Sequence, residues 1–385
     1  KILFTLLILF IYKLGTTVRV PGTENITQDL GFLELLNVMG GGSLKNFSIF
    51  ALGVTPYISA SIIVQLLQMD IIPYFSNLAK EGYSGRTKLN KITRYLGIAL
   101  AFLQGLVMSF SFLGESATSL DYLRVTLILT AGTCFLLWLG DQITRKGVGN
   151  GISILIMAGI LISTPSMMVD AYNAFVVSGT VQEVALGVTK FLLFLLVYIA
   201  IIVGVVFIEK SERRIPVQYS NKTATAYGAK QTYIPFRLNS SGVMPVIFAS
   251  SLISIPSLIA AFVKKDSFSL FVNKYINYNT VTGFILYILL IVLFSYLYTF
   301  MAGLKPKELS ENLNKQGGYI PGVRPGNETK GYISKVLSRT TFLGALFLIV
   351  IAGLPIIVTN LSSLPTSVTV GGTGLLIVVG VALET

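Results

Sequence analysis

The chain has 385 residues, of which 53% are hydrophobic and only 12% are charged, about half the ~25% charge of a typical soluble domain. Such a chain has too few polar groups to cover a soluble surface, so its composition predicts a protein that crosses the membrane several times. The high apolar content, the lack of a glycine period and the single Cys134 exclude intrinsic disorder, collagen and a disulfide scaffold.

The absence of histidine narrows the function further. Without an imidazole there is no Ser–His or Cys–His nucleophile and no HExxH zinc site, and one cysteine cannot build a thiolate metal centre. GxSxG and P-loop motifs are also missing from the sequence. We therefore expect no enzymatic activity, no bound metal and no cofactor.

Apolar runs near the ~20 residues that a helix needs to cross a bilayer occur ten times. They cover residues 2–20, 50–69, 92–113, 123–140, 152–169, 187–208, 243–263, 281–303, 340–359 and 371–385. The first run could be a secretory signal, but it continues to Val20 without a small-residue cleavage site, which favours a first span. The chain starts at Lys1 and stops at Thr385 within apolar runs, so we expect tails beyond both.

Basic residues lie mostly on one side of the membrane if ten crossings alternate from a cytoplasmic start. The loops of that side carry most of the 29 lysines and arginines, whereas the loops of the other side are close to neutral. Positive charge accumulates on the cytoplasmic side, so both termini are predicted to be cytoplasmic.

Two of the basic loops, at about 209–242 and 304–339, are longer than a helix connection needs. The first contains Lys-Ser-Glu-Arg-Arg at 210–214, and the second contains a stretch rich in glycine and proline at 317–326 that favours a shaped loop. We interpret both loops as docking surfaces for a large soluble partner with an acidic or RNA surface. The alternative is a solvated linker whose charge only sets the topology.

The segment at about 35–49 is apolar, too short to span a membrane, and interrupted by three consecutive glycines. Non-helical backbone is tolerated at membrane depth only where protein or an aqueous cavity surrounds it. The segment is therefore either a re-entrant element that dips into a funnel or a connector that lies flat at the interface.

Charged side chains are nearly absent from the spans, which argues against an ion-coupled carrier. The second and seventh runs carry hydroxyls and an amide instead, and such groups hold helices together by only ~0.6 kcal/mol per bond. These residues are Ser59, Ser61, Gln65, Ser250, Ser251 and Ser254.

Five stretches of the sequence, in the same order, resemble the SecY family of bacterial protein-conducting channels. They are residues 40–70, Trp-Leu-Gly-Asp-Gln-Ile-Thr at 138–144, Gly-Asn-Gly-Ile-Ser at 149–153, residues 314–326 and residues 371–379. The resemblance implies an all-α membrane protein with ten transmembrane helices in two pseudo-symmetric five-helix halves, residues 1–170 and 171–385, related by an inverted repeat. The segment at 35–49 would then be the family's plug, with Gly40, Gly41, Gly42, Leu44 and Phe47.

The resemblance also implies a ring of aliphatic side chains that closes the pore at its waist. By motif position these are Val54, Ile58, Ile152, Ile156, Ile247 and Ile377. Composition alone would assign such side chains to lipid-facing or helix-packing positions. An apolar constriction offers water no hydrogen bonds, so it resists ion flow without selecting among polypeptides.

A side exit between the second and third and the seventh and eighth helices is a further property of the family, and the serines and Gln65 match that seam. The family's partners are the SecE and SecG small membrane subunits, the SecA motor ATPase, the ribosome, preproteins that carry a signal sequence, and membrane lipid. The partner-docking residues implied here are Arg213, Arg214, Lys222 and Arg324. Lys222 and Lys230 are the only basic residues at the tip of the first loop, at 215–236, where many members of the family have more. An accessory SecY paralogue that serves a few exported substrates is therefore a variant of this interpretation.

The predicted function is a channel that passes unfolded, signal-bearing polypeptides across the bacterial cell membrane and releases apolar segments sideways into lipid. The predicted protein is multi-pass with both termini cytoplasmic. The alternatives are a secondary transporter of a small solute, which would need polar groups converging at mid-membrane, and a membrane-embedded enzyme, for which no nucleophile–base pair is present.

Overall fold

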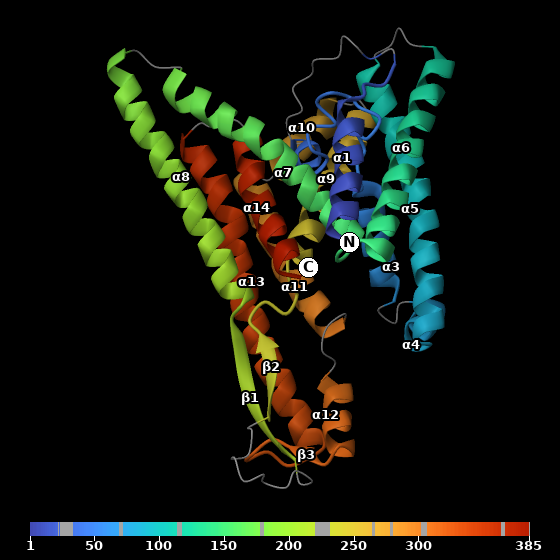
Figure 1. Cartoon of the computed structure of the whole chain (residues 1–385), viewed down its shortest axis with the longest axis vertical. Helices are drawn as coiled ribbons and strands as arrows, with labels where there is room; N and C mark the ends of the chain where they lie inside the picture. Colours follow the sequence, from blue (N-terminus) through green and yellow to red (C-terminus); the bar gives the residue numbers. More distant parts are fainter. Residues whose placement is uncertain are drawn as a thin grey trace.

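A computed structural model describes most of the chain. It covers residues 1–21, 23, 34–68, 72–113, 118–177, 181–219, 232–263, 266–277, 280–301, 306–362 and 366–384. The described part is mostly helical, and a long bundle of helices carries a small sheet at one end (Figure 1).

Each of the ten predicted runs coincides with one helix. These helices are α1 Ile2–Thr17, α3 Thr55–Leu67, α5 Tyr83–Phe112, α6 Ser119–Lys146, α7 Gly151–Tyr172, α8 Val181–Glu209, α9 Met244–Val263, α11 Val281–Met301, α13 Asn327–Ser362 and α14 Thr366–Glu384. In the described part of the chain, six helices are long and apolar enough to cross a membrane, from α5, α6, α7, α8, α11 and α13. The apolar parts of α1, α3, α9 and α14 are shorter.

Local sequence explains where several helices begin. The side chains of Thr118 and Asp121 form a reciprocal capping box at the start of α6, which satisfies backbone N–H groups that a helix leaves unpaired. The Asn150 side chain accepts a hydrogen bond from the Ile152 N–H and so caps α7. Helices α5 and α13 begin nine and thirteen residues before the apolar runs at 92–113 and 340–359, so the first turns of both helices are polar.

Four shorter helices connect the long ones. They are α2 Glu34–Met39, α4 Pro73–Lys80, α10 Asp266–Tyr275 and α12 Pro306–Lys315. A π-helical turn at Asn173–Val177 follows α7.

The expectation of an all-α protein is wrong in one region, because the two long loops contain a three-stranded sheet in the order β2-β1-β3. Strand β1 (Glu212–Tyr219) pairs antiparallel with β2 (Thr232–Arg237) in a register that places Ile215 opposite Ile234. Its far end pairs antiparallel with β3 (Gly318–Tyr319) from the second loop. The alternation of buried Ile215 and Val217 with exposed neighbours is typical of a strand with one covered face.

The two long loops thus fold together into one unit, here called the sheet module, which comprises β1, β2, β3, α12 and the first turns of α13 (Figure 1). Its own apolar core lies apart from the membrane bundle. The buried members of that core are Ile215, Val217, Phe236, Leu313, Ile320, Ile333, Val336 and Leu337. This separate core explains why the two loops have a defined fold.

The largest apolar cluster of the bundle lies where α3, α7, α9, α11, α13 and α14 meet. Helix α3 packs against α5 and α9, and α14 packs against α7 and α13. Residues of α3, near the start of the sequence, and of α14, at its end, therefore line the same centre of the molecule, where the candidate site lies.

Candidate functional site

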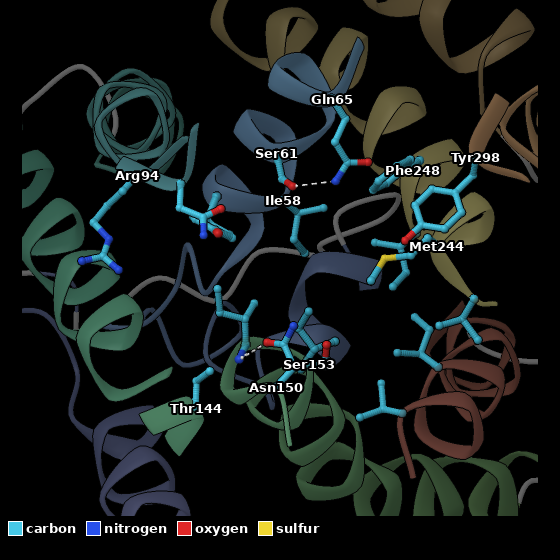
Figure 2. A pocket seen from close by; sticks show the side chains of 18 of the residues that line it. Ile58, Ser61, Gln65, Arg94, Thr144, Asn150, Ser153, Met244, Phe248 and Tyr298 are labelled. Carbon is cyan, nitrogen blue, oxygen red and sulfur yellow. Dashed lines mark hydrogen bonds between the residues drawn. The ribbon is translucent and has the colours of Figure 1, made fainter. Parts of the chain in front are cut away.

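A cavity of about 410 Å³ lies at the centre of the bundle (Figure 2). Five of the six predicted ring residues line it, and they come from four helices: Ile58 from α3, Ile152 and Ile156 from α7, Ile247 from α9, and Ile377 from α14. The sixth, Val54 at the start of α3, is outside the lining but belongs to the same apolar cluster. Five of the six side chains are at most 6% exposed, and Ile152 is partly buried against them.

The aliphatic side chains cover one part of the cavity, and polar side chains cover another. Ser61 and Gln65 of α3 project into the cavity, and the Gln65 amide donates to the Ser61 hydroxyl at 3.1 Å. Asn90 and Arg94 of α5 add to this wall. The remaining polar lining comes from Asp141, Thr144, Asn150 and Ser153. The cavity is therefore polar on one side and apolar on the other.

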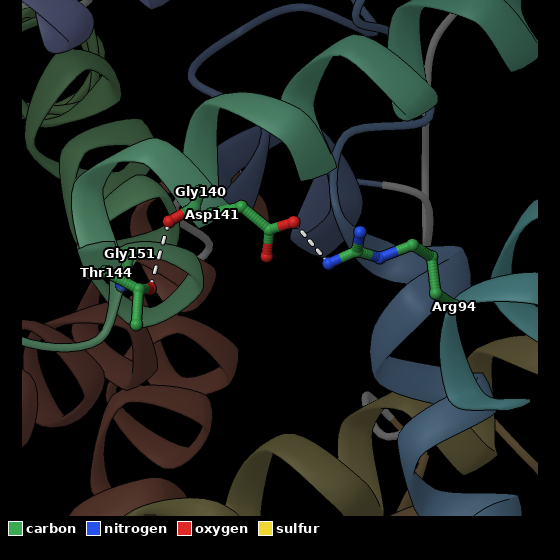
Figure 3. Close-up of polar contacts among 5 residues, drawn as sticks. All are labelled: Arg94, Gly140, Asp141, Thr144 and Gly151. Carbon is green, nitrogen blue, oxygen red and sulfur yellow. Dashed lines mark hydrogen bonds and ion pairs between the residues drawn. The ribbon is translucent and has the colours of Figure 1, made fainter. Parts of the chain in front are cut away.

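An ion pair between Arg94 of α5 and Asp141 of α6 lines the polar wall (Figure 3). The Arg94 side chain is 47% exposed and the Asp141 side chain 26% exposed. Solvent screens such a pair, so its contribution to stability is at most about 1 kcal/mol. The pair holds one positive and one negative charge side by side in the polar wall of the cavity.

Next to this pair, α6 and α7 cross at a glycine contact. A Cβ on Gly151 would come 1.8 Å from the Gly140 carbonyl oxygen, so only glycine permits this approach. The Thr144 hydroxyl donates to the Gly140 carbonyl at 2.9 Å and accepts from the Gly151 N–H at 2.9 Å. This contact explains Gly140 and Gly151 of the stretches 138–144 and 149–153, and it lies next to Ile152, which lines the cavity.

The predicted plug is a compact segment and not an extended connector. Helix α2 ends at Met39, and the left-handed backbone of Gly41 (φ 70°) and Gly42 (φ 80°) reverses the chain. The Asn37 side chain accepts from the Lys45 N–H at 2.9 Å and closes the turn. The segment therefore folds back on itself in a compact turn.

Leu44 and Phe47, which the sequence singled out, do not contact the ring. They pack in a separate cluster with residues of α5 and α6, and the ring of Phe47 lies 5.0 Å from that of Phe112. The side chains that join the ring's cluster are instead Val38 and Met39, neither of which lines the cavity. Glycine spacing indicated the turn but carried no information on which side chains face the ring.

Helix α7 provides the seat of this segment. A Cβ on Gly159 would come 2.2 Å from the Met39 carbonyl oxygen and 2.9 Å from the Tyr12 hydroxyl. The Ser163 hydroxyl donates to the Val38 carbonyl at 3.2 Å. A small residue and a hydroxyl one turn apart thus let the backbone of α2 lie directly on α7.

The predicted seam residues lie on two helices in contact, α3 and α9. Ser59, Ser251 and Ser254 are buried. The hydrogen bonds described for the seam residues do not join α3 to α9. The Ser250 hydroxyl donates to the Val246 carbonyl and lies 3.4 Å from the Tyr287 hydroxyl of α11. The Ser254 hydroxyl donates to the Ser251 carbonyl. The described contact between α3 and α9 therefore relies mainly on apolar side chains.

Three of the four predicted docking residues lie on the surface of the sheet module. Arg213 and Arg324 are exposed, and the Thr329 hydroxyl holds the Arg324 carbonyl at 2.8 Å. Arg214 donates to Glu212 at 2.6 Å and lies 4.7 Å from the centre of the Tyr233 ring. The hydrogen bond to Glu212 raises the pKa of Arg214. Lys222 lies outside the described residues.

Sequence reasoning missed several members of the site. Arg94, Asp141, Tyr57 and Tyr298 line the cavity, although Tyr57 and Asp141 fall within recognised stretches. An arginine and an acid 47 positions apart give no local signal, because only the packing of α5 on α6 brings them together. Among the described residues no cluster of metal-ligating side chains occurs.

The arrangement defines a class of protein: a helical membrane bundle with a central, half-polar cavity that is lined on one side by aliphatic side chains from four helices. The fold is that of a protein-conducting channel, since a solved channel of that kind superposes with a TM-score of 0.72 at 18% identity and covers 99% of this chain and 89% of its own. Sec61 in the canine ribosome–channel complex from the endoplasmic reticulum has a TM-score of 0.68, with the same identity and coverage.

Sequence comparison identifies the family. The profile of the SecY family matches residues 48–385. A protein translocase subunit SecY from Staphylococcus aureus (strain NCTC 8325 / PS 47) is 47% identical over 399 residues, covering 100% of this chain and 92% of the relative. The chain belongs to the SecY family.

Proposed function

We propose that this protein is the pore of a translocase, which passes unfolded polypeptides with a signal sequence across the bacterial cell membrane and releases their apolar segments into lipid. The observation that carries this proposal is the gathering of Val54, Ile58, Ile156, Ile247 and Ile377 in one buried cluster at the edge of the central cavity. These residues are up to 323 positions apart (54 to 377), and four different helices supply the ring.

An aliphatic ring suits this task for two physical reasons. It provides no hydrogen-bond partner, so water and ions are unfavourable at a narrow waist. It also has no directional ligand geometry, so any extended peptide can slide past it. The polar wall formed by Ser61, Gln65 and Arg94 gives such a peptide a hydrated approach.

The chain crosses the membrane ten times in this proposal, with two five-helix halves at 1–170 and 171–385 related by an inverted repeat. Support comes from the ten helices over the ten apolar runs. The excess of basic residues in alternate loops supports cytoplasmic termini, and it puts the sheet module in the cytoplasm.

The segment at 35–49 serves as the plug, and α3, α5, α9 and α11 form the lateral gate. Support for the plug is its seat on α7 and the contact of Val38 and Met39 with the ring's cluster. Support for the gate is the largely apolar contact of α3 with α9, which an apolar signal helix can replace at little cost.

The sheet module is the docking surface for a partner that supplies the driving force, because the sequence contains no nucleotide-binding motif. Its separate core and the exposed Arg213 and Arg324 support a shaped, basic surface. The SecA motor and the ribosome are the proposed partners, and SecE and SecG are the proposed small subunits. A ribosome is present in the complex of the similar Sec61 channel.

Ile377→Asn tests the ring. Ile377 is 3% exposed, so an amide there adds a hydrogen-bonding group to the apolar waist, and we expect ion leakage in planar bilayers and transport of weaker signal sequences. Leu289→Asn on the exposed face of α11 is the matched control. Unchanged conductance of the folded Ile377 variant would remove the ring from the proposal, and solute counterflow by the unmodified chain would favour a small-solute transporter.

A further inference from the structure

Helix α10 is too short to cross a membrane, yet it connects two apolar helices of the bundle. Its ten residues span about 15 Å at 1.5 Å per residue. It follows α9, which ends at Val263, and precedes α11, which begins at Val281. Both of those ends lie on the same face of the bundle, so α10 lies along that face, opposite the sheet module (Figure 1).

A tight turn holds α10 in a defined orientation relative to α11. The Thr282 hydroxyl donates to the Lys274 carbonyl at 3.0 Å, which satisfies an unpaired carbonyl at the end of α10. The Thr280 hydroxyl donates to the Asn277 carbonyl at 2.7 Å and accepts from the Gly283 N–H at 3.2 Å. Helix α10 also packs against α9, and Val272 on its inner side is 1% exposed.

Helix α10 exposes large apolar side chains away from this inner side and beside it. Leu270 is 68% exposed, Phe271 51% and Tyr275 43%. Lys274 lies between them on the helix surface, and its ammonium group is 5.4 Å from the centre of the Tyr275 ring. Apolar side chains that flank one lysine and one tyrosine are unfavourable in water but suit the boundary between headgroups and acyl chains, where a lysine extends toward phosphate.

We propose that α10 is an interfacial anchor that lies in the headgroup layer of the outer leaflet. Leu270 and Phe271 insert at the upper edge of the acyl chains, and the Lys274 ammonium binds the phosphate of a phospholipid. The occupant of this face is therefore lipid.

Continuity with the lipid-facing surface of α11 supports this occupant. Val281 is 77% exposed, Ile285 52% and Leu289 60%, and their spacing of four residues places them on one face of α11. This stripe begins at the capped turn that fixes α10. The exposed apolar face of α10 thus continues into the exposed apolar stripe of α11, a helix long and apolar enough to cross a membrane.

The anchor has a consequence for the bundle. Because α10 contacts both α9 and α11, a movement of the outer end of α9 displaces a helix that is held in the headgroups. The outer end of α9 is then coupled to the lipid surface, whereas residues near its other end line the central cavity.

Depth-dependent fluorescence quenching tests the proposal on the full chain in liposomes. Cys134→Ser is the background, and an environment-sensitive fluorophore is attached at Leu270→Cys, at Leu289→Cys or at Gln316→Cys. The quenchers are phospholipids with a doxyl group near the headgroup or deep in the acyl chain. We expect the Leu270 probe to be quenched most by the shallow doxyl, the Leu289 probe most by the deep doxyl, and the Gln316 probe, in the exposed part of the sheet module, by neither.

The contribution of Lys274 is measured with the same Leu270 probe. We expect stronger quenching by doxyl phosphatidylglycerol than by doxyl phosphatidylcholine, and Lys274→Gln should reduce that preference by up to about fivefold, the effect of one lysine at an anionic surface. A Leu270 probe that no doxyl lipid quenches, while the Leu289 probe is quenched, would overturn the proposal, and an unchanged preference in Lys274→Gln would overturn the phosphate contact. Neither readout depends on transport.

Discussion

Gly159→Ala is the substitution that most directly tests the seat of the plug on α7. An alanine Cβ would lie 2.2 Å from the Met39 carbonyl oxygen, whereas ordinary carbon–oxygen contacts are about 3.3 Å or longer. The end of α2 must therefore retreat by about 1 Å, because the Met39 carbonyl is backbone and cannot rotate away. The Tyr12 hydroxyl, 2.9 Å from the same position, blocks movement in its direction.

Overpacking of this kind costs about 1–3 kcal/mol, which corresponds to a shift of about 5- to 150-fold in an equilibrium between two states. Alanine also stabilises the α7 helix itself by about 0.5–1 kcal/mol relative to glycine. That gain applies whether or not the plug is seated, so it leaves the plug equilibrium unchanged and offsets part of any loss in overall stability.

The assay is the ion conductance of the resting channel in planar bilayers, with the thermal midpoint measured in parallel. We expect Gly159→Ala to leak while its unfolding midpoint changes little. Gly204→Ala on α8 is the matched control, because no atom lies within 4 Å of a Cβ there. If the Gly159 variant and the Gly204 variant conduct equally, α7 does not seat the plug and the reasoning fails.

Three further substitutions test separate parts of the molecule. Phe236→Ala removes a fully buried ring from the core of the sheet module. We expect the free energy of unfolding to fall by about 3–5 kcal/mol, which should appear as rapid proteolysis of the module. Protease resistance equal to that of the unmodified chain would show that this core does not stabilise the module. Tyr12→Phe removes a buried hydroxyl that has no hydrogen-bond partner in the described part of the chain. The free energy of unfolding should be unchanged or higher by up to about 1–3 kcal/mol, and a clear decrease would mean that the hydroxyl is paired. Crosslinking Ser59→Cys to Ser251→Cys in a Cys134→Ser background should stop transport, and transport that persists with a verified crosslink would exclude α3 and α9 as the gate.

Much of the membrane architecture was predictable from the sequence because a bilayer imposes one simple requirement on each span. Apolar runs of sufficient length had to be helical, and a helix overlies each run. The errors arose in polar segments, where no bilayer dictates the secondary structure. Helices α5 and α13 extend past the apolar runs, and the loop at 209–242 contains strands that its charge and turn residues did not indicate.

The amino-acid sequence was enough to establish the class of the molecule, because composition and the length of the apolar runs reflect the bilayer that surrounds each span. The tertiary structure alone decided which side chains meet. It brought Arg94 to Asp141 and put Val38 and Met39, not Leu44 and Phe47, against the ring's cluster. It also joined two distant loops into one sheet. Such contacts depend on how the segments cross, and several of the closest approaches in this chain occur at glycines, among them 140, 151 and 159, whose missing Cβ atoms matter only once another segment lies against them.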